Sequence, residues 1–463
     1  MHVTTPVERS VAPGSTHVEP ASRTSGARLP ALLGLGLLLV GLFVMRVYYG
    51  LSLELRTGDD VQVYLLGLKF FTTGRWPFFG PDVYHETQTQ LPGALQGLLV
   101  GVPLVLTRQP EAPLILLNIL SFAGLLVLGL YLSRRFALIP AWLTCVWLLT
   151  SPWTLNFSTR VYNPSYLLLP SCLFFVAFLE LMPSWGANML PASAAFFLLG
   201  LSLGAALQIH LSWPLLVPFL LAAILARARA RLLTPSQIGW LLLGAAGPLA
   251  LLVPTVVAYG SSSLVESLGG NTRLHGPGLA DLVTIGARFL SFASFEMPHV
   301  LGPRGQAQSE LLRQSPWLIP LLVFLGMLSL AQPILLLAII FRPRLFALPD
   351  GPCRGVRGLV VATVLLIWIF FSFTARPPIA RNYYILCPVA FLAAYVAFGS
   401  LMTGAKARRW VVGILACNIL FHVGFAATRL AADPWAARRA TISRAIQLSD
   451  YRILAERRSH VRY

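Results

Sequence analysis

The sequence predicts an all-α polytopic membrane protein, a bundle of about eleven transmembrane helices with two long extracytoplasmic loops. Three observations lead to this prediction. Hydrophobic residues make up 56% of the 463 positions and charged residues only 11%, and the mean hydropathy is +0.72. Apolar runs long enough to cross a bilayer recur along most of the chain. Short basic connections separate many of these runs, as in loops that remain in the cytoplasm.

The chain divides into three parts. Residues 1–29 are polar and rich in Ser, Pro and Thr, which predicts a disordered cytoplasmic tail rather than a cleaved signal peptide. Residues 30–428 form the transmembrane domain, and residues 429–463 form a tail predicted to lie outside. The segments expected to span the bilayer are 30–50, 113–133, 136–153, 166–182, 189–207, 208–226, 236–258, 318–341, 358–375, 383–402 and 409–428.

One apolar segment, 92–107, is not counted as a span. It is short, begins with Pro92 and is broken by several glycines, so it is predicted to lie at the outer surface or to enter it partway. Counting it as a span would invert the sidedness of every later basic connection. The resulting outer loops are 51–112 and 259–317, and they hold most of the acidic residues. The C-terminal tail carries eight arginines, which the positive-inside rule would place in the cytoplasm.

The net charge of +18 does not indicate a nucleic-acid partner. The basic residues are dispersed in short connections between apolar runs rather than gathered in one patch. The partners that the sequence predicts are therefore membrane lipids and molecules at the membrane surface. The basic connections are Arg134–Arg135, Arg227/Arg229/Arg231, Arg342/Arg344 with Arg354/Arg357, and Lys406/Arg408/Arg409.

An acidic pair, Asp59–Asp60, follows the first apolar run almost at once. Only 17 residues of the chain are Asp or Glu, and two adjacent carboxylates at a membrane–water boundary indicate a site for proton transfer or cation binding. The alternative is structural, since aspartates also satisfy the free N–H groups at a helix start, here the helix expected over 61–71. The spacing alone leaves both interpretations open.

The residues after this pair form a series: Tyr64, then Gly74-Arg75-Trp76-Pro77, then Gln90-Leu91-Pro92-Gly93. The series resembles the first outer loop of the GT-C glycosyltransferases, most closely the bacterial branch related to protein O-mannosyltransferases and lipid A aminoarabinose transferases. The resemblance implies that one aspartate is the general base or positions the substrate. The family usually has Asp-Glu where this chain has Asp-Asp. The position of Tyr64 favours Asp60 as the equivalent, and that of Gly74 favours Asp59.

Two later segments add to the resemblance. Residues 151–164 resemble the family's Ser-Pro…Arg…Asp-Pro pattern, with Arg160 in place and Asn163 where many members have an acid. An amide is a poorer ligand for a divalent cation than a carboxylate, so Asn163 weakens the case for a metal. Residues 376–388 resemble an element near the family's lipid-phosphate site. By this resemblance Arg381, Arg376 and Tyr384 bind the donor phosphate. The alternative for both arginines is snorkelling at a helix end.

The resemblance implies an enzyme of the bacterial inner membrane, with its active site facing the exterior. It would move a sugar from a polyprenyl-phosphate donor to a lipid, glycan or protein acceptor. It implies no certain cofactor, although a divalent cation is compatible with it. His210 is a substrate-binding candidate because it interrupts an apolar stretch, but it could equally be a packed histidine bonded to its neighbours. A solvated loop is the plainer interpretation of Glu296 and His299. The substrate-binding candidates are Tyr64, His210, Arg160, Asn163, Glu86, Glu296 and His299.

Other classes of protein remain compatible with the composition. A glycan polymerase or ligase, a transporter or flippase for lipid-linked glycans, and a non-catalytic GT-C relative would all have many spans. A transporter usually places its ionisable groups near the bilayer midplane, whereas the acids here fall in outer loops. No nucleotide-binding motif or metal-binding Cys/His cluster is present in the sequence. The classes are separated by whether the protein's activity requires the Asp59–Asp60 pair.

Overall fold

The structure, a computed structural model, describes residues 28–84, 89–186, 188–261, 278–292, 310, 312–346, 350–374, 378–402 and 404–456. Most of the predicted N-terminal tail and much of the predicted second outer loop lie outside these ranges. The chain divides into two units, Met1–Gly41 and Leu42–Tyr463. The first unit holds the start of helix α1, Arg28–Leu53, and the second holds the end of α1 and all the other elements described below.

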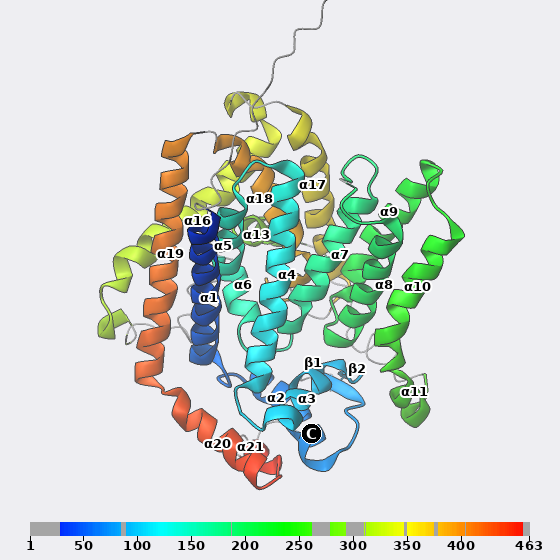
Figure 1. Cartoon of the computed structure of the whole chain (residues 1–463), viewed down its shortest axis with the longest axis vertical. Helices are drawn as coiled ribbons and strands as arrows, with labels where there is room; N and C mark the ends of the chain where they lie inside the picture. Colours follow the sequence, from blue (N-terminus) through cyan, green and yellow to red (C-terminus); the bar gives the residue numbers. More distant parts are fainter. Residues whose placement is uncertain are drawn as a thin grey trace, which may run out of the picture. The chain divides into compact units, whose positions relative to one another are not determined.

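Within these ranges the elements are helical except for one pair of antiparallel strands (Figure 1). In chain order they are α1 (Arg28–Leu53), α2 (Gly58–Thr73), β1 (Phe79–Tyr84), β2 (Thr89–Pro92), α3 (Leu95–Thr107), α4 (Ala112–Phe136), α5 (Ala141–Thr150), α6 (Pro152–Ser158), η2 (Ser165–Leu167), α7 (Leu168–Leu181), α8 (Ala192–Ile209), η3 (Trp213–Leu216), α9 (Val217–Arg229), α10 (Pro235–Ala250), α11 (Val253–Tyr259), α13 (Leu279–Leu290), α16 (Leu318–Phe341), η5 (Pro343–Phe346), α17 (Asp350–Ser372), η6 (Tyr384–Leu386), α18 (Cys387–Leu401), α19 (Ala405–Ala432), α20 (Trp435–Gln447) and α21 (Arg452–Glu456).

The chain is an all-α polytopic membrane protein, as the sequence predicts. Within the described residues, seven helices are long and apolar enough to cross a bilayer, and the bent pair α10 and α11 makes an eighth candidate. The seven lie in α1, α4, α8, α16, α17, η6 with α18, and α19. The prediction of about eleven spans therefore exceeds the number of helices that qualify by length and composition.

The difference comes from three predicted spans, 136–153, 166–182 and 208–226, which form the shorter helices α5, α7 and α9. Helix α5 ends at Thr150, and its cap, Ser151, stands directly before Pro152. Helix α7 follows the 3₁₀ turn η2, and α9 follows η3, which contains Pro214. Proline and 3₁₀ geometry interrupt the regular α-helical bonding, so each apolar run is divided into shorter pieces.

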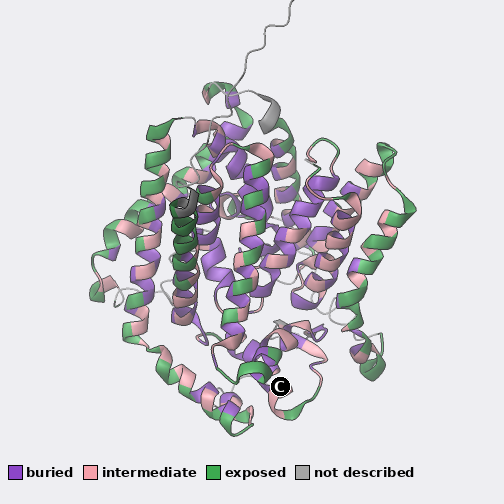
Figure 2. Cartoon of the chain, in the orientation of Figure 1, coloured by how far each residue is buried: buried purple, intermediate pink, exposed green. Residues whose placement is uncertain are grey.

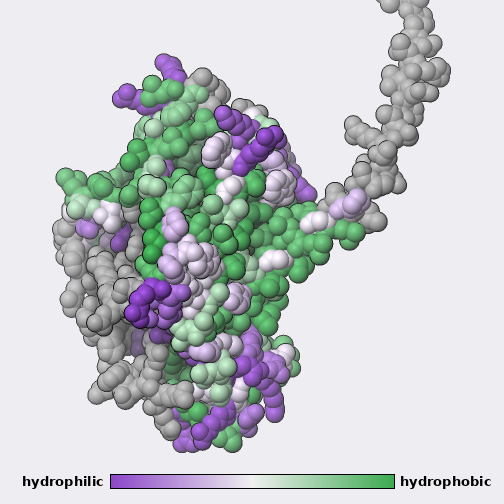
Figure 3. All heavy atoms as spheres, turned by 90° about the vertical axis from the view of Figure 1, so that its left-hand side faces the viewer, coloured by the Kyte–Doolittle hydropathy of each residue, from purple (hydrophilic) through white to green (hydrophobic). Residues whose placement is uncertain are grey.

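The two ends of the bundle differ in charge. The basic connections after α4, between α9 and α10, between α16 and α17, and before α19 lie at one end, as predicted (Figure 1). Helices α2 and α3 and the pair of strands lie at the opposite end, which we call the α2–α3 end. On the face of Leu42–Tyr463 shown in Figure 3, hydrophobic residues cover much of the middle, and hydrophilic residues gather at both ends and in one patch between them. This distribution fits a bilayer around the middle of the bundle.

Segment 92–107 supplies the strand end and helix α3, which packs on α2 rather than spanning the bundle. Glycines on both helices account for this close packing. A Cβ atom on Gly67 of α2 would lie 2.4 Å from a side-chain atom of Val100, and one on Gly101 would lie 2.6 Å from the ring of Phe70. Only glycine permits so close an approach of the two helices. The predicted surface location of the segment agrees with this packing.

The C-terminal helices α20 and α21 also lie at the α2–α3 end (Figure 1). Arg439 of α20 donates to Glu111 at 2.6 Å, and Arg438 donates to the backbone carbonyl of Leu51 at 3.0 Å. Asp433 pairs with both Arg438 and Arg56. Part of the tail's positive charge is thus paired with acidic residues, one of which, Glu111, belongs to the predicted first outer loop. The tail and that loop share one side of the bundle.

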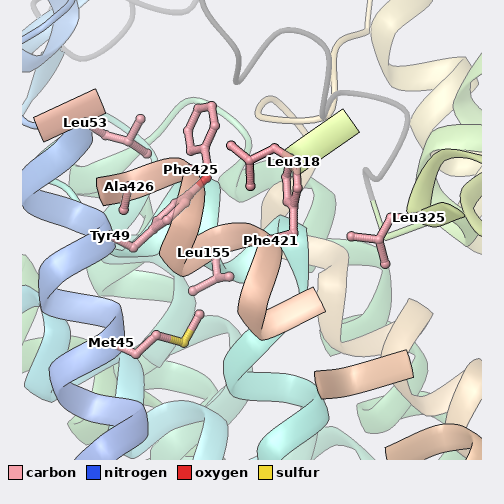
Figure 4. Packing of buried hydrophobic residues seen from close by; sticks show 9 residues of the cluster. All are labelled: Met45, Tyr49, Leu53, Leu155, Leu318, Leu325, Phe421, Phe425 and Ala426. Carbon is pink, nitrogen blue, oxygen red and sulfur yellow. The ribbon is translucent and has the colours of Figure 1, made fainter. Parts of the chain in front are cut away.

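A hydrophobic core anchors the end of α1 that leads into the first loop (Figure 4). It joins α1 to α6, α16 and α19, and Tyr49 of α1 donates to Asn156 of α6 at 2.6 Å. Buried residues dominate α5, α6, α7 and α18, whereas α10 and α19 expose much of their length (Figure 2). The core comprises Met45, Tyr49, Leu53, Leu155, Leu318, Leu325, Phe421, Phe425 and Ala426.

Substituting Gly50 with alanine is expected to destabilise the protein by about 1–3 kcal/mol, because α1 touches the turn after α6 at this glycine. A Cβ atom there would lie 2.1 Å from the carbonyl oxygen of Thr159. Gly413→Ala on α19 is the matched control, since a Cβ atom at that position meets nothing within 4 Å. The thermal unfolding midpoint in detergent measures both variants, and equal midpoints would contradict the close approach.

Candidate active site

Three segments distant in the sequence meet at the α2–α3 end. They are the turn from α1 into α2, the turn after α6, and the residues before η6. Their charged side chains form a group that we call the carboxylate–guanidinium cluster. Its links are a 3.1 Å ion pair between Asp60 and Arg160 and a 3.1 Å ion pair between Asp59 and Arg381. The cluster consists of Glu54, Asp59, Asp60, Arg160 and Arg381.

Asp60 is fixed in place by the start of α2. Its carboxylate accepts hydrogen bonds from the backbone N–H groups of Arg56 and Thr57, both at 3.1 Å, and Thr57 caps the helix in return. The same oxygen receives Arg160, and the side chain is fully buried. Burial raises the pKa of Asp60, while Arg160 and Thr57 act in the opposite direction. The capping role that the sequence left open is therefore confirmed for Asp60.

Asp59 is the accessible member of the pair. Its side chain is 49% exposed, and its partner Arg381 is 31% exposed. Consecutive helical residues point about 100° apart, so one aspartate faces the core and the other faces outward. A reactant at this surface can reach Asp59 but not Asp60. The chemistry available here is a carboxylate beside a guanidinium, both open to solvent.

Tyr162 connects the two ion pairs, and sequence reasoning did not select it. The guanidinium of Arg160 lies 4.5 Å from the centre of its ring, and Arg381 donates a hydrogen bond to its hydroxyl. Burial raises the pKa of Tyr162, although Arg381 opposes the shift, so the hydroxyl stays protonated at neutral pH. Because it accepts from Arg381, its own proton is available to a further acceptor.

Arg160 keeps its charge although it is buried. Burial is the largest single influence and lowers its pKa, but Asp60, Tyr162 and Glu54 together outweigh burial and hold the pKa above its ordinary value. The adjacent Asn163 accepts a hydrogen bond from Gln96 through its backbone oxygen at 2.9 Å. The predicted substrate-binding residue Arg160 is thus a buried partner of Asp60, and the turn that carries it is tied to α3.

Glu54 completes the cluster and was not among the site residues that the sequence predicted. It is fully buried, and its carboxylate accepts the backbone N–H of Val161 at 2.9 Å. Burial, and then the negative charge of Asp60, raise the pKa of Glu54 well above its usual range. The one signal in the sequence was an acidic residue directly at the end of an apolar run, where a carboxylate is costly unless it has a role.

Substituting Glu54 with glutamine is expected to stabilise the protein increasingly as the pH rises. The folded pKa of Glu54 is raised, so its contribution to stability is fully present below the unfolded pKa, about 4.3, and is lost as the pH rises through the folded value. Glutamine can still accept from Val161 and does not ionise. The measurement is the thermal unfolding midpoint of the wild type and of Glu54→Gln between pH 4 and pH 8. A difference between the two midpoints that does not change with pH would contradict the prediction.

The other predicted residues lie around the cluster or away from it. Tyr64 is buried and donates to the backbone carbonyl of Pro110 at 3.0 Å. Tyr384 is buried against the rings of Trp153 and Phe157. These contacts give both tyrosines packing roles. Neither hydroxyl has a recorded contact with the cluster.

His210 lies near the cluster, but its ring nitrogen Nδ1 contacts a residue of its own turn. Its Nδ1 accepts the backbone N–H of Ser212 at 3.2 Å and lies 2.8 Å from that residue's hydroxyl. Burial, and then the positive charge of Arg381, lower the pKa of His210 to about 3. The ring is therefore neutral. These contacts agree with the alternative interpretation of His210 as a packed histidine. Its hydrogen bonds, however, are to Ser212 in its own turn and not to a neighbouring helix.

Four predicted residues, Glu86, Glu296, His299 and Arg376, lie outside the described residues. Across the described part of the chain, no three His, Cys, Asp or Glu side chains are grouped closely enough to hold a metal ion.

No protein-family model matches the sequence, and no curated protein matches it. Among solved structures, the chain is similar to ArnT from Cupriavidus metallidurans, a lipid A aminoarabinose transferase. The crystal structure of ArnT bound to undecaprenyl phosphate has 16% sequence identity and a TM-score of 0.47, covering 88% of this chain and 79% of that one. The apo structure of the same protein has 16% identity and a TM-score of 0.44, covering 87% and 78%.

Proposed function

We propose that this protein is a GT-C-type glycosyltransferase that moves a sugar from a polyprenyl-phosphate donor to an acceptor hydroxyl on the outer side of a bacterial inner membrane. The observation that carries the proposal is the solvent-open pair of Asp59 and Arg381, 3.1 Å apart at the α2–α3 end. A carboxylate beside a guanidinium supplies the two functions that this transfer requires, a base for the acceptor and a cation for the phosphate.

In the proposed reaction Asp59 accepts the proton of the acceptor hydroxyl as its oxygen bonds to the anomeric carbon of the sugar. The bond from that carbon to the phosphate oxygen breaks, and its electron pair leaves with the polyprenyl phosphate. Arg381 stabilises the charge that develops on the phosphate through charge-assisted hydrogen bonds. In the same proposal the hydroxyl of Tyr162, which accepts from Arg381, donates a hydrogen bond to a substrate oxygen.

The buried part of the cluster positions these groups. Asp60 and Arg160 join the start of α2 to the turn after α6, and Glu54 holds the backbone of that turn at Val161. The sidedness follows from the charges, because the basic connections gather at the end opposite to the site. The α2–α3 end then faces the exterior, where a lipid-linked sugar is the available form of activated donor.

The test is release of free polyprenyl phosphate from a panel of polyprenyl-phosphate sugars. Purified protein and the Asp59→Asn/Asp60→Asn double variant are compared, with membrane extract as the source of acceptor. Release by the wild type alone supports a transferase and identifies its donor. No release from any donor by well-folded protein would favour a polymerase, a transporter or a non-catalytic binder of lipid-linked glycans.

Substituting Arg381 with glutamine is expected to lower kcat/KM for the donor about 10- to 100-fold, because a charged hydrogen bond to phosphate contributes about 1.5–3 kcal/mol. Most of the loss should be a raised KM for the donor. Arg75→Gln is the matched control, since Arg75 is an exposed arginine of the same predicted loop as Asp59. Similar donor kinetics for the two variants would remove Arg381 from the proposed phosphate site.

A further inference from the structure

A polar pocket lies between the turn after α3 and helix α20. None of its lining residues belongs to the carboxylate–guanidinium cluster. Its volume is about 360 Å³. The α3 side contributes Arg108, Gln109 and Pro110, and the α20 side contributes four residues spaced along the helix. The lining consists of Arg108, Gln109, Pro110, Arg439, Ser443, Ile446 and Gln447.

The α20 wall presents a row of polar groups. Arg439, Ser443 and Gln447 follow one another at intervals of four residues, so they lie on one face of the helix. The hydroxyl oxygen of Ser443 is buried and has no hydrogen-bond partner among the described residues. A buried polar atom without a partner is costly and indicates that a ligand or water completes its bonding.

The pocket carries an excess of positive charge. The guanidinium of Arg439 uses its Nε to bond Glu111 at 2.6 Å and one terminal nitrogen to reach Gln109 at 3.3 Å. Its other terminal nitrogen has no recorded bond within the described part of the chain. Arg108 faces the same pocket, and none of the described residues is recorded as a partner of its side chain. The guanidiniums of Arg108 and Arg439 carry two positive charges, and the carboxylate of Glu111 balances one of them. One positive charge remains for a ligand.

The walls are held in place before any ligand arrives. Tyr64 donates to the carbonyl of Pro110 at 3.0 Å, and Arg438 ties α20 to Leu51 at 3.0 Å. Arg108 adopts a left-handed backbone with φ of 53°, a conformation that an arginine rarely takes. This is the C-cap position of α3, where the backbone N–H of Arg108 donates to the carbonyl of Leu104 at 2.9 Å, so the end of the helix fixes the start of the turn.

We propose that this pocket binds a phosphate group. A tetrahedral oxyanion accepts bidentate bonds from guanidiniums and further bonds from hydroxyl and amide donors, and the pocket presents all three. The phosphate belongs either to a lipid headgroup at the membrane surface or to a free anion. The site is separate from the residues proposed for sugar transfer and does not depend on that activity.

The test uses the full-length protein in phosphatidylcholine nanodiscs and follows its thermal unfolding midpoint. Inorganic phosphate is titrated against chloride at equal ionic strength, and a parallel set of nanodiscs contains phosphatidic acid. Arg108→Gln is expected to weaken binding at least about tenfold, the loss of one charged hydrogen bond. Ser443→Leu, which fills the pocket without changing charge, is expected to abolish the midpoint shift. Arg444→Gln removes an exposed arginine of α20 outside the pocket and should bind like the wild type.

A shift with inorganic phosphate that depends on Arg108 supports a free-anion site. A shift that depends on Arg108 but requires phosphatidic acid supports a lipid headgroup site. If Arg108→Gln and Ser443→Leu both respond like Arg444→Gln under every condition, the proposal is overturned. Because the readout is unfolding rather than transfer, this result is independent of the glycosyltransferase assay.

Discussion

Asp59→Asn is expected to lower the proposed sugar transfer by about 10²- to 10⁴-fold, the range that a positioned general base contributes, and to leave the unfolding midpoint unchanged. Folding is expected to be unaffected because the side chain is half exposed, and its ion pair within the described ranges is the open one with Arg381. Asparagine keeps the size of the side chain and can still accept a bond from Arg381, but it is far too weak a base to take a proton.

The measurement is the initial rate of polyprenyl phosphate release at saturating donor. Asp82→Asn is the matched control, since it removes a carboxylate from β1, in the same predicted loop but outside the cluster. The control should retain the wild-type rate. Near-normal turnover of Asp59→Asn would reject Asp59 as the base, and inactivity of a well-folded Asp60→Asn alone would transfer the role to its neighbour.

Asp60→Ala is expected to destabilise the protein by about 3–5 kcal/mol, because it leaves the guanidinium of Arg160 buried without its counter-ion. Loss of the capping bonds to Arg56 and Thr57 adds about 1 kcal/mol. Transfer also falls, in this case because less folded protein is present. Chemical unfolding in detergent gives the free energy, and the activity per folded molecule separates the two effects.

The double variant Asp60→Ala/Arg160→Met distinguishes a buried pair from two independent residues. Replacing both partners by apolar groups restores much of the stability, because no uncompensated charge remains. Asp450→Ala, at an exposed ion pair on the predicted tail, should leave the unfolding midpoint unchanged. If the losses of the two single substitutions simply add in the double variant, the ion pair does not couple the two turns.

The sequence was sufficient for the helical class and for the gathering of the basic connections at one end, because both follow from composition and local charge. It also located the acidic pair, but its two interpretations could not be separated by spacing. The structure assigns capping to Asp60 and solvent exposure to Asp59, a difference set by the direction of each side chain on one helical turn.

The rest of the site depends on contacts that no local pattern encodes. Asp59 and Arg381 are 322 residues apart, and the role of Tyr162 follows only from the positions of both arginines. Glu54 was overlooked because a single acid at the end of a span has no motif. Tyr64 fitted a motif, yet its side chain turns into the core to hold Pro110. Within the described residues fewer helices than predicted spans qualify by length and composition, because prolines and 3₁₀ turns divide three of the apolar runs.

The separation of Asp59 from Arg381 also has a consequence for biosynthesis. At about 5–20 residues per second, the ribosome reaches Arg381 roughly 20–60 s after it has made Asp59. During that interval the carboxylate of Asp59 lacks the guanidinium of Arg381, whereas that of Asp60 waits only until Arg160 is made, 100 residues after it. Water at the membrane surface can solvate these charges, whereas the hydrocarbon interior cannot. Placing the acids beyond the end of α1 thus lets the nascent chain insert stepwise and assemble its site only near the end of translation.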